Sequence, residues 1–300
     1  MPPPSVVGDA RAKQGGGVAA ALRGRLPQQL QSPRMTALLA FYAFSIGAVI
    51  GSFLNVVIHR YPREESIVFP PSHCPNCNTN IRWFDNIPIV SYLVLRGRCR
   101  NCRIGISPRY PLIELANALF YLAIFQRTGA TVLFIPIAAI VSMTIVLIFI
   151  DLEIQILPDV IDIPGIVIGL LIGWIGGELA SGLVLSANLV DAIAGALLGA
   201  AILVAIILAY WLVRRREGMG WGDVKMIAMI GAVLGWQSVP AVLLIASISG
   251  AVIALPLALR SKEGFQLAIP FGVFLGIAAL VILFFGHTLF EWWLGAFVPR

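Results

Sequence analysis

After residue 35, the chain is dominated by long apolar runs that are separated by short polar segments. The eight runs cover residues 36–58, 111–126, 131–150, 160–177, 189–213, 224–236, 239–259 and 268–293. Within each run the apolar residues are continuous, without the alternation of strands in a membrane β-barrel. A helix needs about 20 apolar residues to cross a bilayer. The pattern therefore predicts an all-α polytopic membrane protein with about eight transmembrane helices, although runs 111–126 and 224–236 are short for a full span.

The composition narrows the class of protein further. Of the 300 residues, 59% are hydrophobic and 12% are charged, about half of the ~25% charged residues in an average soluble domain. A soluble globular protein is therefore not expected, and the hydrophobicity is too high for disorder. The formal net charge is +6. In a membrane protein, basic loops mainly set topology, so we expect a lipid bilayer and no nucleic acid as partner.

The basic residues are concentrated on one side of the predicted bundle. They follow the first, fifth and seventh runs, as Arg60, Arg63, Arg82, Arg96, Arg98, Arg100, Arg103, Arg109, Arg214, Arg215, Arg216, Arg260 and Lys262. The turns on the opposite side contain only one basic residue, Arg127. Because basic loops stay in the cytosol, these three loops are predicted to be cytosolic.

Residues 1–34 differ from the rest of the chain. They are rich in Pro, Gly, Gln and Arg and contain no apolar run, so we expect a disordered tail. Met35 is an alternative start, because the five basic residues of the tail would otherwise lie on the outer side. The remaining organisation is a first transmembrane helix at 35–58, a cytosolic loop at 59–110 and a transmembrane domain at 111–300.

Glycines recur every four residues in the fourth run, at Gly165, Gly169, Gly173 and Gly177, and the theme is repeated at Gly195 and Gly199. This spacing places small residues on one helix face and permits close approach of a neighbouring helix. We interpret it as a packing feature without a chemical role.

All four cysteines lie in the predicted cytosolic loop, as two CxxC pairs: Cys74 with Cys77, and Cys99 with Cys102. Two such pairs at this spacing are typical of a four-cysteine zinc site. Disulfides are the alternative, and they are disfavoured in the cytosol. Four thiolates complete the coordination shell, so a bound zinc would be structural and would help to fold the loop.

Two aspartates lie at the predicted cytosolic ends of apolar runs. Asp151 ends the third run, and Asp223 follows Gly220 and Gly222 in a GxGD sequence. Two neighbouring carboxylates that share a proton can perform aspartic proteolysis, and the glycines would let a substrate strand approach. Either aspartate alone is more simply explained as a helix cap. Asp159 is the rival of Asp151 for the first role.

Six segments resemble the type IV prepilin peptidases, which belong to the GxGD intramembrane aspartic proteases. Besides the CxxC pairs they are GSFLNVVIHRYP (51–62), SPRYPLIEL (107–115), DLEIQILPD (151–159), GMGWGDVKM (218–226) and IPFGVFLG (269–276). The resemblance covers nearly all of residues 36–293. It implies an enzyme of the bacterial inner membrane that cleaves the basic leader of prepilins or pseudopilins after a glycine, at the cytosolic face.

The resemblance also implies methylation of the new N-terminus with S-adenosylmethionine, for which the chain has no GxGxxG sequence. By position, Asp151 and Asp223 would be catalytic. Gly97 and Arg98 are candidates for methyl transfer. Glu114 could bind the new amine or pair with a nearby arginine, and Lys225 could tune Asp223 or extend to the interface. The alternatives are a peptidase without methylation, a transporter and a non-catalytic assembly protein.

Overall fold

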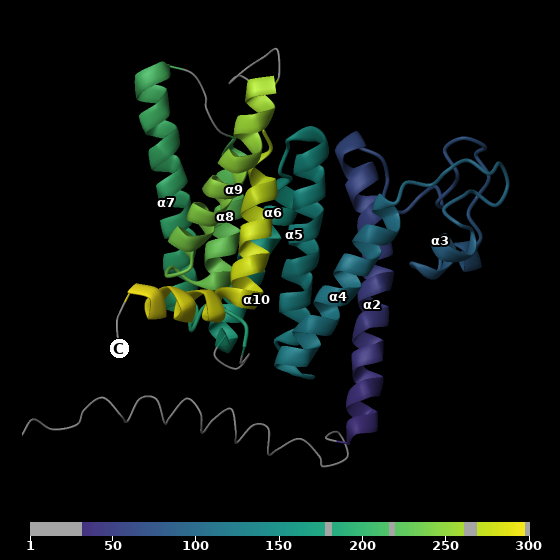
Figure 1. Cartoon of the computed structure of the whole chain (residues 1–300), viewed down its shortest axis with the longest axis horizontal. Helices are drawn as coiled ribbons and strands as arrows, with labels where there is room; N and C mark the ends of the chain where they lie inside the picture. Colours follow the sequence, from purple (N-terminus) through teal and green to yellow (C-terminus); the bar gives the residue numbers. More distant parts are fainter. Residues whose placement is uncertain (1–31, 178–181, 216–219, 261–268, 298–300) are drawn as a thin grey trace, which may run out of the picture.

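The computed structural model describes residues 32–177, 182–215, 220–260 and 269–297. The described part is helical, with only two isolated β-bridges (Figure 1). The α-helices are α2 (Pro33–Arg60), α3 (Val90–Val94), α4 (Arg109–Thr128), α5 (Phe134–Ile154), α6 (Asp159–Ile175), α7 (Leu189–Arg214), α8 (Trp221–Leu234), α9 (Val239–Arg260) and α10 (Phe271–Phe297). Two short 3₁₀ helices are η2 (Tyr61–Arg63) and η3 (Trp83–Asp85). The predicted tail lies outside the described residues, except for its last three.

Each of the eight apolar runs forms a helix, but fewer helices are candidate membrane spans. Five described helices are long and apolar enough to cross a membrane; the spans are Pro33–Arg63, Phe134–Ile154, Leu189–Arg214, Val239–Leu257 and Phe271–Glu291. At 1.5 Å per residue, α6 and α8 extend only about 26 and 21 Å, short of the ~30 Å hydrocarbon core. Helix α4 contains three charged residues. The chain is thus a multi-pass membrane protein, and eight full spans are not confirmed.

Helix α8 is short and lies inside the bundle. Its residues from Met226 to Leu234 are all buried, and α8 contacts α6, α7, α9 and α10. The glycines predicted to serve packing line its two neighbours: a Cβ atom at Gly169 would clash with Ala232, and one at Gly195 would clash with the Gly231 backbone. Close contacts on both sides therefore fix α8, which carries Asp223 at its start.

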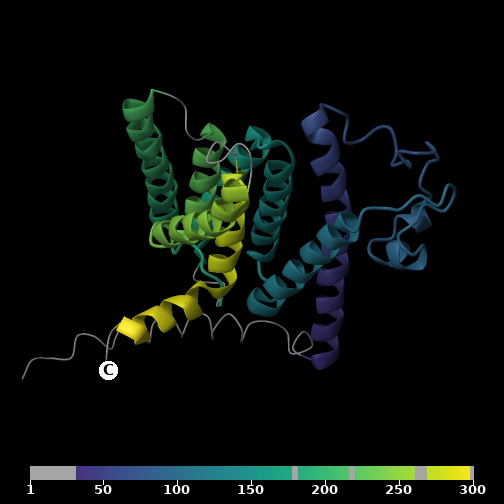
Figure 2. The ribbon, with the colours of Figure 1, turned by 45° about the horizontal axis from the view of Figure 1, so that its top comes forward.

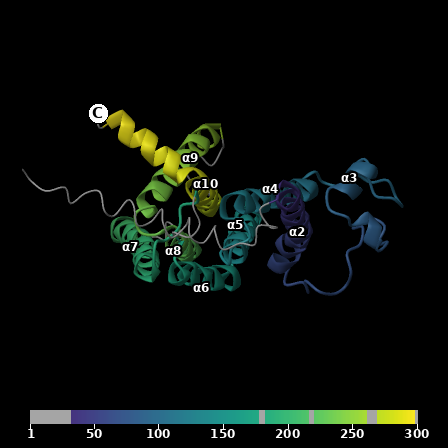
Figure 3. The ribbon, with the colours of Figure 1, turned by 90° about the horizontal axis from the view of Figure 1, so that it is seen from below.

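Helices α2 and α4 form a separate pair that a buried polar chain joins to α5. The amide of Asn117 donates to the carbonyl of Gly47 at 2.7 Å. Its oxygen accepts a 3.0 Å hydrogen bond from Ser142, whose hydroxyl lies 3.1 Å from that of Tyr121. Figures 2 and 3 show α5 between this pair and α7 to α10, with α3 beyond the pair on the outer side.

Candidate active site

Asp151 lies in the last turn of α5, where the helix ends and Gln155 adopts a left-handed conformation. Its side chain is buried, and one carboxylate oxygen accepts a 3.0 Å hydrogen bond from the backbone N–H of Val273. Val273 is in the first turn of α10. The N-terminus of a helix carries unpaired N–H groups and a partial positive charge. The start of α10 therefore holds the Asp151 carboxylate in a fixed orientation.

Asp223 lies in the first turn of α8, for which Gly220 is the N-cap residue. Its carboxylate is also buried, and it receives a hydrogen bond from the Gly220 backbone. The carboxylates of Asp223 and Asp151 are close enough to repel each other electrostatically. The structure thus brings the two sequence-predicted aspartates into one buried site, and two such groups can hold a proton between them.

Leu157 joins the two aspartate segments to the start of α10. A Cβ atom at Gly222 would lie 2.8 Å from the Leu157 Cβ, and one at Gly272 would lie 3.0 Å from the Leu157 Cδ1. Side chains larger than hydrogen at either position would push these segments apart. Leu157 therefore leaves no room for a side chain at Gly222. At Gly220, the nearest side-chain atom to a Cβ among the described residues is Oδ2 of Asp223, 3.8 Å away.

Lys225 has a partner other than Asp223. Its ammonium group forms a 2.5 Å ion pair with Asp159, whose side chain is exposed, whereas that of Lys225 is only partly exposed. Asp162, one turn further along α6, is fully buried, and its oxygens have no hydrogen-bond partner among the described residues. The charges of Asp159, Lys225 and Asp223 are close enough to interact with the Asp162 carboxyl group. A third buried carboxylate thus lies near Asp223.

The cysteine loop meets α5 close to Asp151. Arg109, at the start of α4, forms an ion pair with Glu153 and lies over the ring of Phe149. Glu114 is buried in α4 and accepts a 2.7 Å hydrogen bond from the Ile89 backbone N–H. The sequence suggests an arginine partner for Glu114. Among the described ion pairs, however, none includes Glu114, and Arg109 pairs with Glu153 instead. Glu114 joins the loop to α4.

The four cysteine sulfurs form a compact cluster, with all Sγ atoms within 4.8 Å of one another. Sγ of Cys74 is 3.7 Å from that of Cys102, and Sγ of Cys77 is 4.0 Å from that of Cys99. A tetrahedral zinc with Zn–S bonds of about 2.3 Å requires S···S separations of about 3.8 Å. All four are free cysteines, so the donor set fits a metal such as zinc, and His73 is outside it.

The two CxxC turns have the same backbone geometry. The N–H of Asn78 bonds to the Cys74 carbonyl, and the N–H of Arg103 bonds to that of Cys99. Hydrogen bonds from Thr79 lower the pKa of the Cys77 thiol to about 6. Backbone N–H groups of Cys102 and Asn101 likewise hold the pKa of Cys99 below its usual value. Backbone N–H groups of Cys77 and Asn76 lower the pKa of Cys74, but burial and the neighbouring thiols of Cys77 and Cys99 raise it overall to about 11. Because thiolates are the ligands of zinc, each turn has one cysteine, Cys77 or Cys99, that readily supplies one.

Gly97 and Arg98 lie between α3 and the second CxxC turn. Gly97 has a φ of +64°, and a Cβ atom there would lie 2.9 Å from the ring of Tyr92. This conformation and close contact give Gly97 a structural reason to be glycine. The Arg98 side chain is exposed and its backbone forms a bridge with Gly105. Their proposed part in methyl transfer stays a prediction.

Sequence reasoning did not assign a role to Leu157, Gly272 or Val273. The segment IPFGVFLG resembles a family motif, and Pro270 immediately before α10 is typical of a helix start. The hydrogen bond between Val273 and Asp151 joins residues 122 positions apart, which no local pattern reveals.

Two protein-family models match the chain. The model described as the Bacterial Peptidase A24 N-terminal domain matches residues 45–128, and the model of the Type IV leader peptidase family matches residues 138–255. The first match contains the cysteine cluster, and the second contains both aspartates. No solved structure matched the chain.

Similar curated proteins carry the name prepilin leader peptidase/N-methyltransferase. The one from Myxococcus xanthus is 41% identical over 218 residues, covering 73% of this chain and 63% of that protein. The one from Burkholderia pseudomallei strain 1026b is 35% identical, covering 82% of this chain and 85% of that protein. The one from Aeromonas hydrophila is 37% identical, covering 85% of this chain and 93% of that protein. The predicted family resemblance is confirmed.

Proposed function

Because this chain belongs to the type IV leader peptidase family, we propose that it removes the basic leader from prepilins or pseudopilins and methylates the new N-terminus. The observation that carries the proposal is the buried pair of Asp151 and Asp223, each held at a helix N-terminus. The relatives named above carry both activities in their names. Cleavage is expected after the last glycine of the leader.

The aspartate pair supplies acid and base for hydrolysis. One charged carboxylate removes a proton from water, and the water oxygen attacks the carbonyl carbon of the leader's glycine. The protonated carboxylate donates to the carbonyl oxygen. The C–N bond then breaks: the carboxyl that took the water proton gives it to the leaving amine, and the other carboxylate takes back a proton from a hydroxyl group of the intermediate. The α10 N–H that holds Asp151 fixes its orientation through this exchange. Gly220, next to Asp223, is proposed to let a substrate strand approach.

Methyl transfer is assigned to the side of the enzyme that carries the cysteine loop. S-adenosylmethionine would supply the methyl group to the neutral amine. Cys74, Cys77, Cys99 and Cys102 would hold a structural zinc, and Gly97 and Arg98 next to this cluster are the predicted methyl-transfer residues. Glu114 is the predicted contact of the amine; its burial and its hydrogen bond to Ile89 favour a role in attaching the loop.

The enzyme is proposed to lie in the bacterial inner membrane, with the aspartates and the cysteine loop at the cytosolic face. The basic loops support this orientation. Glu153, which pairs with Arg109 at this face, is a candidate contact for the basic leader.

The proposal is tested by incubating the reconstituted protein with a purified prepilin and S-adenosylmethionine, and by measuring the intact mass of the product. We expect loss of the leader and the addition of one methyl group. Cleavage without methylation would support the alternative, a peptidase alone. An unchanged prepilin, with the enzyme folded and metal-bound, would contradict the proposed function.

A further inference from the structure

The loop between α2 and α4 has an apolar exterior and almost no apolar interior. Among residues 61–108, all of which are described, only Cys74 and Ser91 are buried. The loop nevertheless exposes many large apolar side chains, including Phe69, Trp83, Leu93 and Val94. Contiguous apolar surface on a soluble unit normally marks a binding face. The loop is therefore organised around the four-cysteine cluster, while its large apolar side chains lie at the surface.

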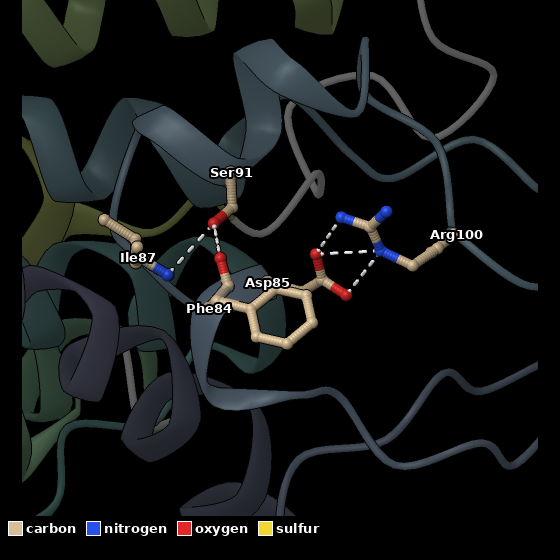
Figure 4. A network of polar contacts seen from close by, with 5 residues as sticks. All are labelled: Phe84, Asp85, Ile87, Ser91 and Arg100. Atoms are coloured by element: carbon tan, nitrogen blue, oxygen red, sulfur yellow. Dashed lines mark hydrogen bonds and ion pairs between the residues drawn. The ribbon is translucent and has the colours of Figure 1, made fainter.

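Helix α3 presents one apolar face in a fixed direction. The Ser91 hydroxyl donates to the Phe84 carbonyl at 2.9 Å and accepts from the Ile87 N–H at 3.0 Å, as Figure 4 shows. Because these hydrogen bonds hold the Ser91 side of α3 toward the loop, the opposite side of the helix faces outward. Val90, Leu93 and Val94 are exposed by 53%, 67% and 70%. Their spacing of three and four residues places them on one helix face.

This apolar face lies beside the membrane helices. The hydrogen bond from Ile89 to Glu114 attaches the start of α3 to α4. Figures 1 and 3 show α3 beside α2 and α4, on the side away from α5, and not beyond the end of α2. Helix α4 also has exposed apolar residues, at Leu112, Leu115 and Leu119. The α3 face thus lies near a surface that lipid would cover.

The surroundings of α3 are strongly basic. Between residues 80 and 106 the sequence contains five arginines (Arg82, Arg96, Arg98, Arg100 and Arg103) and one acidic residue, Asp85. Asp85 is bound by Arg100 (Figure 4), so it does not offset the other four. Trp83 is 82% exposed next to Arg82. Tryptophan is enriched at membrane interfaces, and clustered arginines attract anionic headgroups.

We propose that the apolar face of α3, formed by Val90, Leu93 and Val94, inserts into the anionic lipid leaflet next to α2 and α4. The flanking arginines bind the phosphate groups of that leaflet. The cysteine cluster would then be held against the membrane surface, where an N-terminus released from a membrane-embedded substrate remains. The lipid contact rests on the membrane-spanning fold and does not require the proposed catalysis.

The proposal is tested by photo-crosslinking the full-length protein in nanodiscs. The photoreactive residue is introduced as Leu93→p-benzoylphenylalanine, with Gly105→p-benzoylphenylalanine as the control, because a side chain at Gly105 meets no neighbouring atom. The discs contain either phosphatidylcholine alone or phosphatidylcholine with phosphatidylglycerol. Metal content and prepilin cleavage are measured on each variant, to separate loss of folding or of activity from loss of lipid contact.

We expect mass spectrometry to detect a phospholipid adduct at position 93, several-fold more abundant than at position 105 and several-fold more abundant in discs that contain phosphatidylglycerol. A crosslink from position 93 to a prepilin or to a second copy of the chain would overturn the proposal, because a protein would then cover this face. Reaction with neither lipid nor protein would overturn it as well. Equal lipid adducts in both kinds of disc would overturn the part assigned to the arginines.

Discussion

Asp151 and Val273 are joined by a 3.0 Å hydrogen bond from the Val273 backbone N–H to the Asp151 carboxylate, although 122 residues separate them in the chain. The bond places the end of α5 against the start of α10. A Cβ atom at the neighbouring Gly272 would lie 2.9 Å from the same carboxylate oxygen. The position of Asp151 therefore depends on backbone atoms of a distant helix, and small changes at the start of α10 should affect it.

Gly222 and Leu157 provide a direct test of this close packing. The variant Gly222→Ala should reduce prepilin cleavage by roughly 5- to 150-fold, since forcing a methyl group into a filled site costs about 1–3 kcal/mol and would displace the Asp223 segment. The matched variant Gly220→Ala should lose less of the cleavage rate than Gly222→Ala, because a Cβ atom at position 220 would have more room. The measurement is the cleavage rate at equal amounts of folded enzyme.

A second substitution makes the glycine prediction specific. In Gly222→Ala combined with Leu157→Ala, the opposing side chain is shortened, and part of the lost cleavage should return. If Gly220→Ala were the more damaging variant, or if the double variant were less active than Gly222→Ala, contact with Leu157 would not explain the need for glycine.

Arg109 and Glu153 should act as a coupled pair. Both side chains are about three-quarters buried, and Glu153 is two residues from Asp151. Arg109→Gln and Glu153→Gln should each lower the melting temperature and the cleavage rate. The double variant should be no worse than the more damaged single variant, with a coupling of about 0.5–3 kcal/mol. Additive losses in a double-mutant cycle would argue against the pair.

Metal removal should separate the two activities. The protein should contain about one zinc per chain, measured by elemental mass spectrometry. Cys77→Ser should lose the metal, increase hydrogen exchange across residues 72–106 and abolish methylation, because the loop has little apolar core. Cleavage should remain detectable, since the aspartates lie on α5 and α8.

His73→Ala is the matched control for the metal site, because His73 adjoins Cys74 but lies outside the cluster. It should keep the metal and both activities. Normal methylation in metal-free Cys77→Ser would refute a role of the metal-bound loop in methyl transfer.

The helices and the compact cysteine cluster could be predicted from the sequence, because apolar runs and short motifs are local patterns. The meeting of Asp151 with Asp223 could be predicted because both end up at the same predicted membrane face and both belong to motifs of the resembled family. The number of spans could not be predicted in the same way: α8 is apolar because it is surrounded by other helices, and at 14 residues it is too short to span a bilayer by itself. The roles of Leu157 and Val273, the pairing of Arg109 with Glu153, and the burial of Asp162 arise only from tertiary packing.

The central claim is that Asp151 and Asp223 together hydrolyse the leader. Its most direct test is the rate of prepilin cleavage, measured by intact mass of the product, in Asp151→Asn, Asp223→Asn and Asp159→Asn. The first two should each lose roughly 10²–10⁴-fold or more, because each removes one half of the acid–base pair. Asp159→Asn should keep most of the rate, since Asp159 is exposed and pairs with Lys225. Normal cleavage in Asp151→Asn or Asp223→Asn, or loss in Asp159→Asn alone, would contradict the assignment.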